Sequence, residues 1–180
     1  MSSKAAEGVS LEHIIVVGGS ADEWASLADD QWAVRLAELG KVADHVGAQW
    51  LVVRPFGAAA GAAAGAPARR ETTVGGCLIV ADAQGDGRER LARTVAGLQA
   101  AGQPIGEATI SAALNEPARA DPDLVVVVGA KHRMPPSLVW ELAYSELVFV
   151  DTTFQHFGPG HLDEAIGSYA HRHRRFGGID

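Results

Sequence analysis

Two runs of consecutive branched aliphatic residues limit the folds open to this chain. Residues 14–17 read Ile-Ile-Val-Val and are followed by two glycines, and residues 124–128 read Leu-Val-Val-Val-Val. An uninterrupted aliphatic run is typical of a strand covered on both faces, as in a parallel sheet, whereas a strand with one wet face alternates apolar and polar residues. The sequence therefore predicts a buried parallel sheet, with a first strand from His13 that ends in a Gly-rich turn.

Strands and helices are expected to alternate along the rest of the chain. Ser20 and Glu23 have the spacing of a capping box at the start of the first helix, and Gly47 is suited to end it. Residues 102–122 are polar and interrupted by proline, which is typical of a loop. The other expected strands lie at 50–54, 77–81 and 147–150, and the expected helices at 20–46, 88–101, 137–145 and 162–175. This order predicts an α/β fold, a single domain with a mostly parallel central sheet flanked by helices.

The 180 residues suit one domain. We expect a flexible N-terminus at 1–10 and the domain at 11–180. Within the domain, residues 57–70 are expected to form an Ala/Gly-rich linker, because 57–68 are almost entirely alanine and glycine and have little to bury.

Charge and cysteine content exclude several classes of protein. Fifteen Lys and Arg against 22 Asp and Glu give a net charge of −7, which disfavours nucleic-acid binding. A single cysteine, Cys77, excludes an internal disulfide and a cysteine-based zinc site. The N-terminus lacks a hydrophobic signal core and the aliphatic runs are far shorter than a membrane span, so we expect a cytoplasmic protein with no transmembrane segment.

Three segments carry a resemblance to a known family. Residues 13–25 read H-I-I-V-V-G-G-S-A-D-E-W-A, beside a family pattern H-x-x-x-x-M-D-G-N-G-R-W-A. Residues 123–149 follow the pattern D-L-x-I-R-T-G-G-E-x-R-x-S-N-F-L-x-W-Q-x-A-Y-x-E-L-x-F, and residues 174–178 read R-R-F-G-G. These patterns resemble the cis-prenyltransferases of the undecaprenyl diphosphate synthase type. The resemblance implies their fold, shortened here, and their reaction, which joins isopentenyl diphosphate to an allylic diphosphate with the help of Mg²⁺.

The positions that the resemblance assigns to catalysis are degenerate here. The family's metal-binding aspartate aligns with Gly19, its loop asparagine with Ala21 and its phosphate-pairing arginine with Glu23. An arginine and a serine that bind isopentenyl diphosphate align with Val127 and Pro135. The linker also replaces a helix that lines the family's apolar product tunnel. The resemblance therefore implies that the chain has no catalytic residues and is inactive alone.

Other positions are kept. Arg175, Phe176 and Gly177 match an R-x-G motif that reaches a partner's diphosphates, as in non-catalytic subunits of the Nogo-B receptor type. Arg133 matches a residual diphosphate-binding position, and Glu146 a position associated with metal and with the subunit interface. The implied function is a non-catalytic subunit of a heteromeric cis-prenyltransferase. It would have no cofactor of its own, Mg²⁺ in the catalytic partner, and peripheral membrane association through the partner or product.

Three alternatives stay open. In the first, residues 13–25 are shifted relative to the family pattern, so that Asp22 takes the place of the metal-binding aspartate. A divergent active prenyltransferase would use Asp22 or Glu146 for Mg²⁺ and make a short or irregular isoprenoid diphosphate. A homodimeric regulatory or binding protein would have no prenyl partner.

Overall fold

The first aliphatic run forms a central strand of one six-stranded sheet. The computed structural model describes residues 10–57, 69–129 and 132–176, with the backbone alone for 173–176. The strands follow the order β3-β4-β2-β1-β5-β6, in which β3 and β4 pair antiparallel and every other neighbouring pair is parallel. Their bounds are β1 His13–Val17, β2 Trp50–Arg54, β3 Arg70–Val74, β4 Cys77–Ala81, β5 Leu124–Val128 and β6 Glu146–Val150. The predicted fold class is confirmed.

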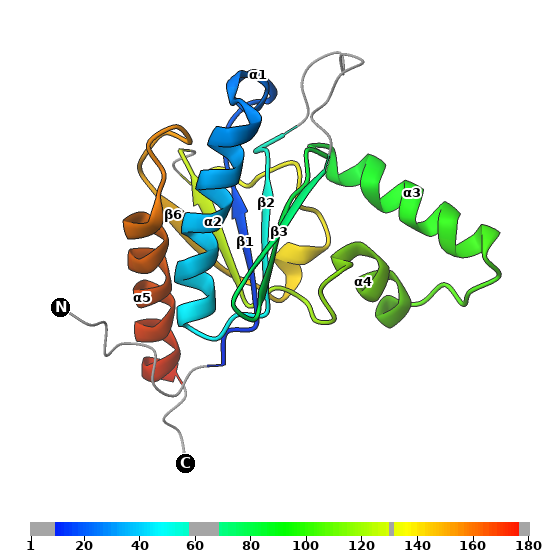
Figure 1. Ribbon diagram of the computed structural model, residues 1–180. Helices are drawn as coiled ribbons and strands as arrows, with labels where there is room; N and C mark the ends of the chain where they lie inside the picture. The colour runs from blue at the N-terminus through cyan, green and yellow to red at the C-terminus, as the bar shows by residue number, and fades with distance from the viewer. Residues whose placement is uncertain (1–9, 58–68, 130–131, 177–180) are drawn as a thin grey trace.

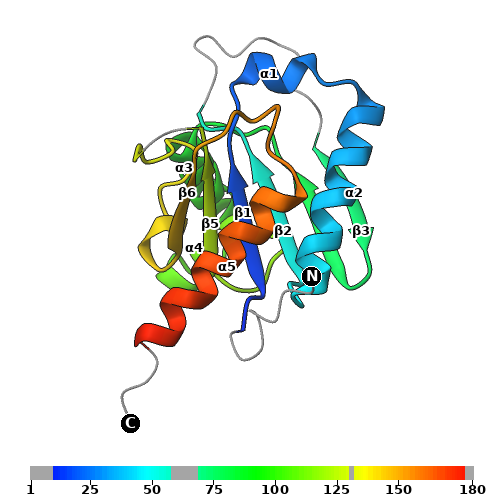
Figure 2. The ribbon, with the colours of Figure 1, turned by 90° about the vertical axis from the view of Figure 1, so that its left-hand side faces the viewer.

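Helices cover both faces of the sheet. Helices α2 and α5 lie on one side, while α3 and α4 lie on the other and extend away from it (Figure 1). The view turned by 90° shows α2 and α5 in front of the strands and α3 and α4 behind them (Figure 2). The helices are α1 Ala21–Ser26, α2 Asp29–His45, α3 Gly87–Ala100, α4 Glu107–Asn115, α5 Pro159–Phe176 and a 3₁₀ turn, η1, Glu141–Ala143.

The sheet separates two apolar cores of unequal size. Alternate residues of β1 pack into the two cores. Ile14 and Val16 belong to the larger core under α2 and α5, and Ile15 and Val17 belong to a smaller core on the opposite face. Successive side chains of a strand point to opposite faces, so a strand with two buried faces must be apolar at every position. This explains the uninterrupted run in the sequence.

The predicted helix at 20–46 is two helices. Leu27 and Ala28 adopt extended backbone angles, and the Gln31 side chain accepts a hydrogen bond from the Ala28 N–H at 2.9 Å, which starts α2. The break brings the Trp24 and Trp32 rings to 4.7 Å between centroids. In a continuous helix, positions eight apart are separated by roughly 12 Å along the axis. The close, tilted packing of two buried tryptophans therefore accompanies the interruption.

The predicted helix at 137–145 is wrong, because this segment bonds outward to other elements. The Ser137 carbonyl accepts a hydrogen bond from Arg90 Nη2 at 3.2 Å, and Trp140 Nε1 donates to Ser111 Oγ at 2.6 Å. Regular structure is limited to η1. Conversely, α4 occupies part of the stretch expected to be a loop at 102–122.

Strand β3 was not predicted. Its residues, Arg-Glu-Thr-Thr-Val, are half-buried or exposed, as suits an edge strand that is protected by charge. The signal that could have found it is the dipeptide Gly75-Gly76 between two β-rich segments, which is typical of a hairpin. Gly75 has φ +56°, and the Gly76 N–H donates to Asp44 Oδ1 at 2.7 Å.

The expected linker at 57–70 lies mainly outside the described residues, and its last residue, Arg70, already belongs to β3. In the described parts of the chain, no helix combines the length and apolar character needed to cross a bilayer.

Candidate functional site at the carboxyl edge of the sheet

The turn after β1 lies at the carboxyl edge of the sheet, where ligands of open α/β folds bind. The Gly18 N–H donates to the Arg54 carbonyl at 3.0 Å, and the Phe56 N–H donates to the Gly19 carbonyl at 3.0 Å. These bonds join the ends of β1 and β2. Helix α1 begins directly after the turn, so its N-terminus and the ends of two strands meet in one place.

The start of α1 is already occupied by a carboxylate of the chain itself. Glu23 accepts a hydrogen bond from the Ser20 N–H at 2.8 Å, and Ser20 Oγ accepts one from the Glu23 N–H at 3.2 Å. This confirms the predicted capping box. Glu23 stands where the resemblance expects a phosphate-pairing arginine, and its negative charge opposes a second anion at the helix start. Ala21, the first residue of α1, supplies a methyl group alone.

Gly19 has no room for a side chain. Its backbone has φ +77°, and a β-carbon built there would lie 2.7 Å from the Phe154 ring and 3.0 Å from Trp24 Cδ1. The Phe154 and Trp24 rings are stacked, with centroids 5.8 Å apart and planes at 12°. Two buried aromatic rings thus fill the space that an aspartate at this position would require.

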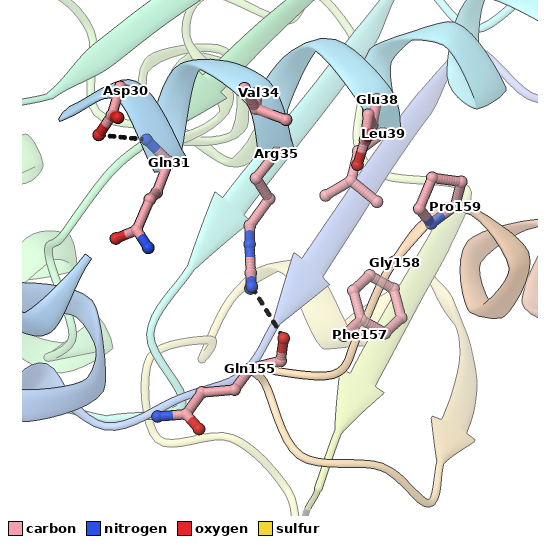
Figure 3. Close-up of a pocket in the computed structure, with 10 residues that line it drawn as sticks. All are labelled: Asp30, Gln31, Val34, Arg35, Glu38, Leu39, Gln155, Phe157, Gly158 and Pro159. Carbon is pink, nitrogen blue, oxygen red and sulfur yellow. Dashed lines mark hydrogen bonds between the residues drawn. The ribbon is translucent and has the colours of Figure 1, made fainter. Parts of the chain in front are cut away.

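Arg35 of α2 fixes the segment that carries Phe154. Its guanidinium donates to the carbonyls of Phe154 at 2.6 Å and Gln155 at 3.0 Å, and lies 4.8 Å from the Phe154 ring centroid. Figure 3 shows Arg35 reaching across the floor of a cavity of about 370 Å³ between α2 and residues 155–159 to the Gln155 carbonyl. Burial lowers the pKa of Arg35. The sequence analysis missed this residue, because nothing distinguishes it from other arginines on an amphipathic helix.

The predicted residual diphosphate-binding residue lies at the same edge. Arg133 is exposed, and its guanidinium lies 5.4 Å from the centroid of the Phe56 ring. Since Phe56 also bonds to Gly19, the structure brings Arg133 near the turn after β1. Val127 is buried in the smaller core and Pro135 is buried as well, so neither side chain offers a polar group to a ligand.

Glu146 lies at the opposite end of the sheet. It begins β6 and pairs with Leu124, the first residue of β5, so it is separated from the carboxyl edge by roughly 13 Å of strand. Its carboxylate accepts a hydrogen bond from Arg172 of α5 at 3.0 Å. Within one chain, the structure does not bring Glu146 together with Gly19 or Asp22.

The predicted C-terminal motif lies mostly outside the described residues. Arg175 and Phe176 are in the last turn of α5 and their backbone alone is described, while Gly177 follows the described part of the chain.

Comparison with known proteins places the chain in a family. The family model of undecaprenyl diphosphate synthases matches residues 66–177, more than half of the chain. The chain belongs to this family. Isoprenyl transferase 2 of Bradyrhizobium diazoefficiens is 40% identical over 91 residues, which are 51% of this chain and 36% of that protein. A chloroplastic (2Z,6Z)-farnesyl diphosphate synthase of Solanum lycopersicum is 51% identical over 57 residues, 32% of this chain and 20% of that protein. The chain thus spans about a third or less of the length of these relatives.

A solved structure shows the same fold. Lavandulyl diphosphate synthase from Lavandula x intermedia, in complex with dimethylallyl diphosphate, superposes with a TM-score of 0.60 at 17% identity. The match covers 89% of this chain and 95% of that one. The cis-prenyltransferase architecture expected from the sequence is confirmed.

The two positions of the turn after β1 that the resemblance assigns to diphosphate and metal, Gly19 and Glu23, do not fit the Mg²⁺ ion that the family implies. Mg²⁺ binds through one or two carboxylates together with substrate phosphates. Gly19 supplies no carboxylate, that of Glu23 is bonded to the Ser20 N–H, and Asp22 is exposed in the first turn of α1. Across the described residues, no group of three or more His, Cys, Asp or Glu could hold a metal.

The face of the sheet toward α3 and α4 holds buried charged side chains that were not predicted from the sequence. Arg54 and Asp82 form an ion pair at 2.9 Å with side chains 5% and 12% exposed, and Arg90 of α3 pairs with Glu141, which is fully buried. The side of the sheet that faces α3 and α4 therefore carries buried charged groups.

Proposed function

We propose that this chain is a non-catalytic subunit of a heteromeric cis-prenyltransferase. The observation that carries the proposal is the contact between Gly19 and Phe154, because it removes both the metal-binding carboxylate and the space for one. A catalytic partner would condense isopentenyl diphosphate with an allylic diphosphate. That partner would hold the Mg²⁺ and the product tunnel.

The electrostatics of the turn after β1 support this role. Glu23 places a negative charge at the helix N-terminus, where an allylic diphosphate would need positive groups. Each charge-assisted hydrogen bond to a phosphate contributes about 1.5–3 kcal/mol. With Val127 and Pro135 apolar, Arg133 is the remaining cation among the positions assigned to isopentenyl diphosphate.

The C-terminal motif defines what the chain would contribute. Arg175 and Phe176 end α5, and Arg172 of the same helix is bonded to Glu146 and to the Leu147 carbonyl, both at 3.0 Å. These bonds tie the last turns of α5 to the edge strand β6. In the proposed complex, Arg175 and Gly177 complete the partner's diphosphate site.

The test compares the chain alone with the chain plus a catalytic homologue from the same source. We expect no turnover of isopentenyl diphosphate by the chain alone and stimulated turnover in the mixture. Arg175→Ala should lower the rate of the complex without preventing its assembly. Robust turnover by the purified chain would overturn the proposal, and co-purification of homodimers alone would favour a regulatory or binding protein.

A second candidate is an active enzyme that makes a short or irregular isoprenoid diphosphate. Two names favour it: the Solanum lycopersicum relative is named a (2Z,6Z)-farnesyl diphosphate synthase, and the solved structure with the same fold is named a lavandulyl diphosphate synthase. Asp22 would then be the metal ligand. Asp22→Ala should abolish turnover in this case and leave the accessory role intact, with Asp163→Ala, an equally exposed aspartate of α5, as the matched control.

A further inference from the structure

A second cavity lies on the other side of the sheet from α2 and α5. It has a volume of about 400 Å³ and opens between the ends of β2 and β4 and the helices α3 and α4. Four arginines and two acidic residues lie among those that line it: Arg54, Arg69, Arg90, Arg93, Asp82 and Glu116. The lining therefore includes more cationic than acidic side chains, although Glu71, Glu141 and Glu89 outside it also pair with three of the arginines.

Two of these arginines are buried and have unused donors. The side chains of Arg54 and Arg90 are 5% and 7% exposed. Arg54 bonds to Asp82, and Arg90 bonds to Glu141 and to the carbonyls of Leu114 and Ser137. Among the described residues, the Nε of each has no hydrogen-bond partner. These two Nε atoms are shielded from solvent, as are Glu141 Oε2 and Ser137 Oγ, which also lack a partner among the described residues. The capacity to bind a further acceptor from the cavity therefore lies with the terminal nitrogens, of which Arg54 uses Nη1 for Asp82.

The two buried arginines also repel each other. Burial and the positive charge of Arg90 both lower the pKa of Arg54, against the opposing effects of Asp82 and Glu141. An additional negative charge at the cavity would offset this repulsion.

The rim supplies two further cations that are held weakly. Arg69 and Arg93 are 44% and 57% exposed and pair with Glu71 at 2.6 Å and Glu89 at 2.7 Å. Exposed ion pairs of this kind contribute about 0–1 kcal/mol. Both arginines can therefore turn to a stronger acceptor that enters the cavity.

We propose that this cavity binds a phosphate group, either free or as the ester of a small polar molecule. Arg54 and Arg90 would hold it at the base and Arg69 and Arg93 at the rim, since guanidinium groups bond phosphate oxygens in pairs. Charged residues line much of the cavity, so a hydrocarbon chain would gain nothing from entering it. The site is separate from the turn after β1 and does not depend on the function proposed above.

The experiment is isothermal titration of the purified chain with inorganic phosphate and with glycerol 1-phosphate at constant ionic strength. The variants are Arg69→Gln and Arg93→Gln, because the buried arginines cannot be removed without leaving a carboxylate unpaired. The control is Lys41→Gln, which makes the same charge change on α2 across the sheet. Each rim variant should weaken phosphate binding about tenfold, the loss expected for one charge-assisted bond, and the control should leave it unchanged.

Three results would overturn the proposal. The first is no saturable binding of either ligand at millimolar concentration. The second is an equal loss of phosphate affinity in the rim variants and in the Lys41 control. The third is binding of octyl phosphate more than about tenfold more tightly than phosphate, which would indicate an apolar site. Tighter binding of glycerol 1-phosphate than of phosphate would identify an ester as the ligand, and equal binding would identify the free ion. Glu89→Gln, which frees Arg93, should tighten binding.

Discussion

A β-carbon on Gly19 would lie 2.7 Å from the ring of Phe154. The two residues are 135 positions apart, and their close approach leaves no room for a side chain at position 19, where the resemblance places the family's metal-binding aspartate. Three features act together at this place. They are the Phe154 ring, the positive φ of Gly19 and the hydrogen bonds from Arg35 that hold residues 154–155. Placing a carboxylate at position 19 would require changes in all three.

Gly19→Asp should destabilise the protein by about 2–4 kcal/mol, because it adds overpacking against Phe154 to a backbone conformation that disfavours side chains. Urea unfolding measures the loss. The control is Gly97→Asp, at an α3 glycine whose β-carbon would meet no neighbour within 4 Å. If Phe154→Ala does not reduce the cost of Gly19→Asp in a double-mutant cycle, the contact is not its cause.

Arg35→Met should destabilise the protein by about 1.5–3 kcal/mol, because it removes hydrogen bonds from a charged donor to two backbone carbonyls. Tryptophan fluorescence should change as well, since Trp24 stacks on Phe154. Arg35→Lys keeps the charge but not the two-pronged geometry, and is expected to recover part of the stability. Full recovery by lysine would show that charge alone matters.

His13 should make stability depend on pH. It is fully buried, its Nδ1 lies 2.9 Å from the Ala120 carbonyl, and burial lowers its pKa below 6.5. Below pH 6.5 the unfolded chain binds a proton that the native chain does not, so this contribution to stability is complete above pH 6.5 and is lost as the pH falls. The slope should approach about 1.4 kcal/mol per pH unit.

Urea unfolding between pH 7.5 and pH 5 measures this slope, and His13→Gln is the control that should flatten it. An identical slope in the variant would assign the dependence to other groups.

Cys77 should resist thiol reagents in the native protein. It is buried, and burial together with the Asp44 charge raises its pKa to about 11. The thiolate is the reactive form, so at pH 8 about one thiol in a thousand is ionised. Ellman's reagent should react slowly with the native chain and rapidly in urea. Rapid native reaction would show that β4 opens readily.

Local patterns predicted more of the fold than of the site. The capping box of Ser20 and Glu23 and the aliphatic strands β1 and β5 depend on neighbouring residues, so their periodicity and spacing reveal them. The edge strand β3 is polar and has no apolar pattern, and the 137–145 segment is shaped by its bond from Arg90. The 137–145 segment thus depends on a distant partner, whereas β3 pairs with the adjacent strand β4 and its local signal is limited to Gly75-Gly76.

The site shows the same division. The resemblance pointed to Gly19 and Glu23 as altered positions. It could not show that the Phe154 ring fills the space beside Gly19, or that Arg35 holds the Phe154 segment in place. The pairing of Arg90 with Glu141, 51 residues apart, likewise requires the folded chain.

The unequal cores make the two sides of the sheet differently tolerant of mutation. Large side chains lock α2 and α5 to the strands, whereas the buried residues of α3 are Gly87 and Arg90. Substitutions at the exposed positions of α3 and α4 should therefore cost less stability than substitutions in the larger core. The buried ion pairs of Arg54 and Arg90 are the exception, because removing one partner leaves a buried charge unpaired.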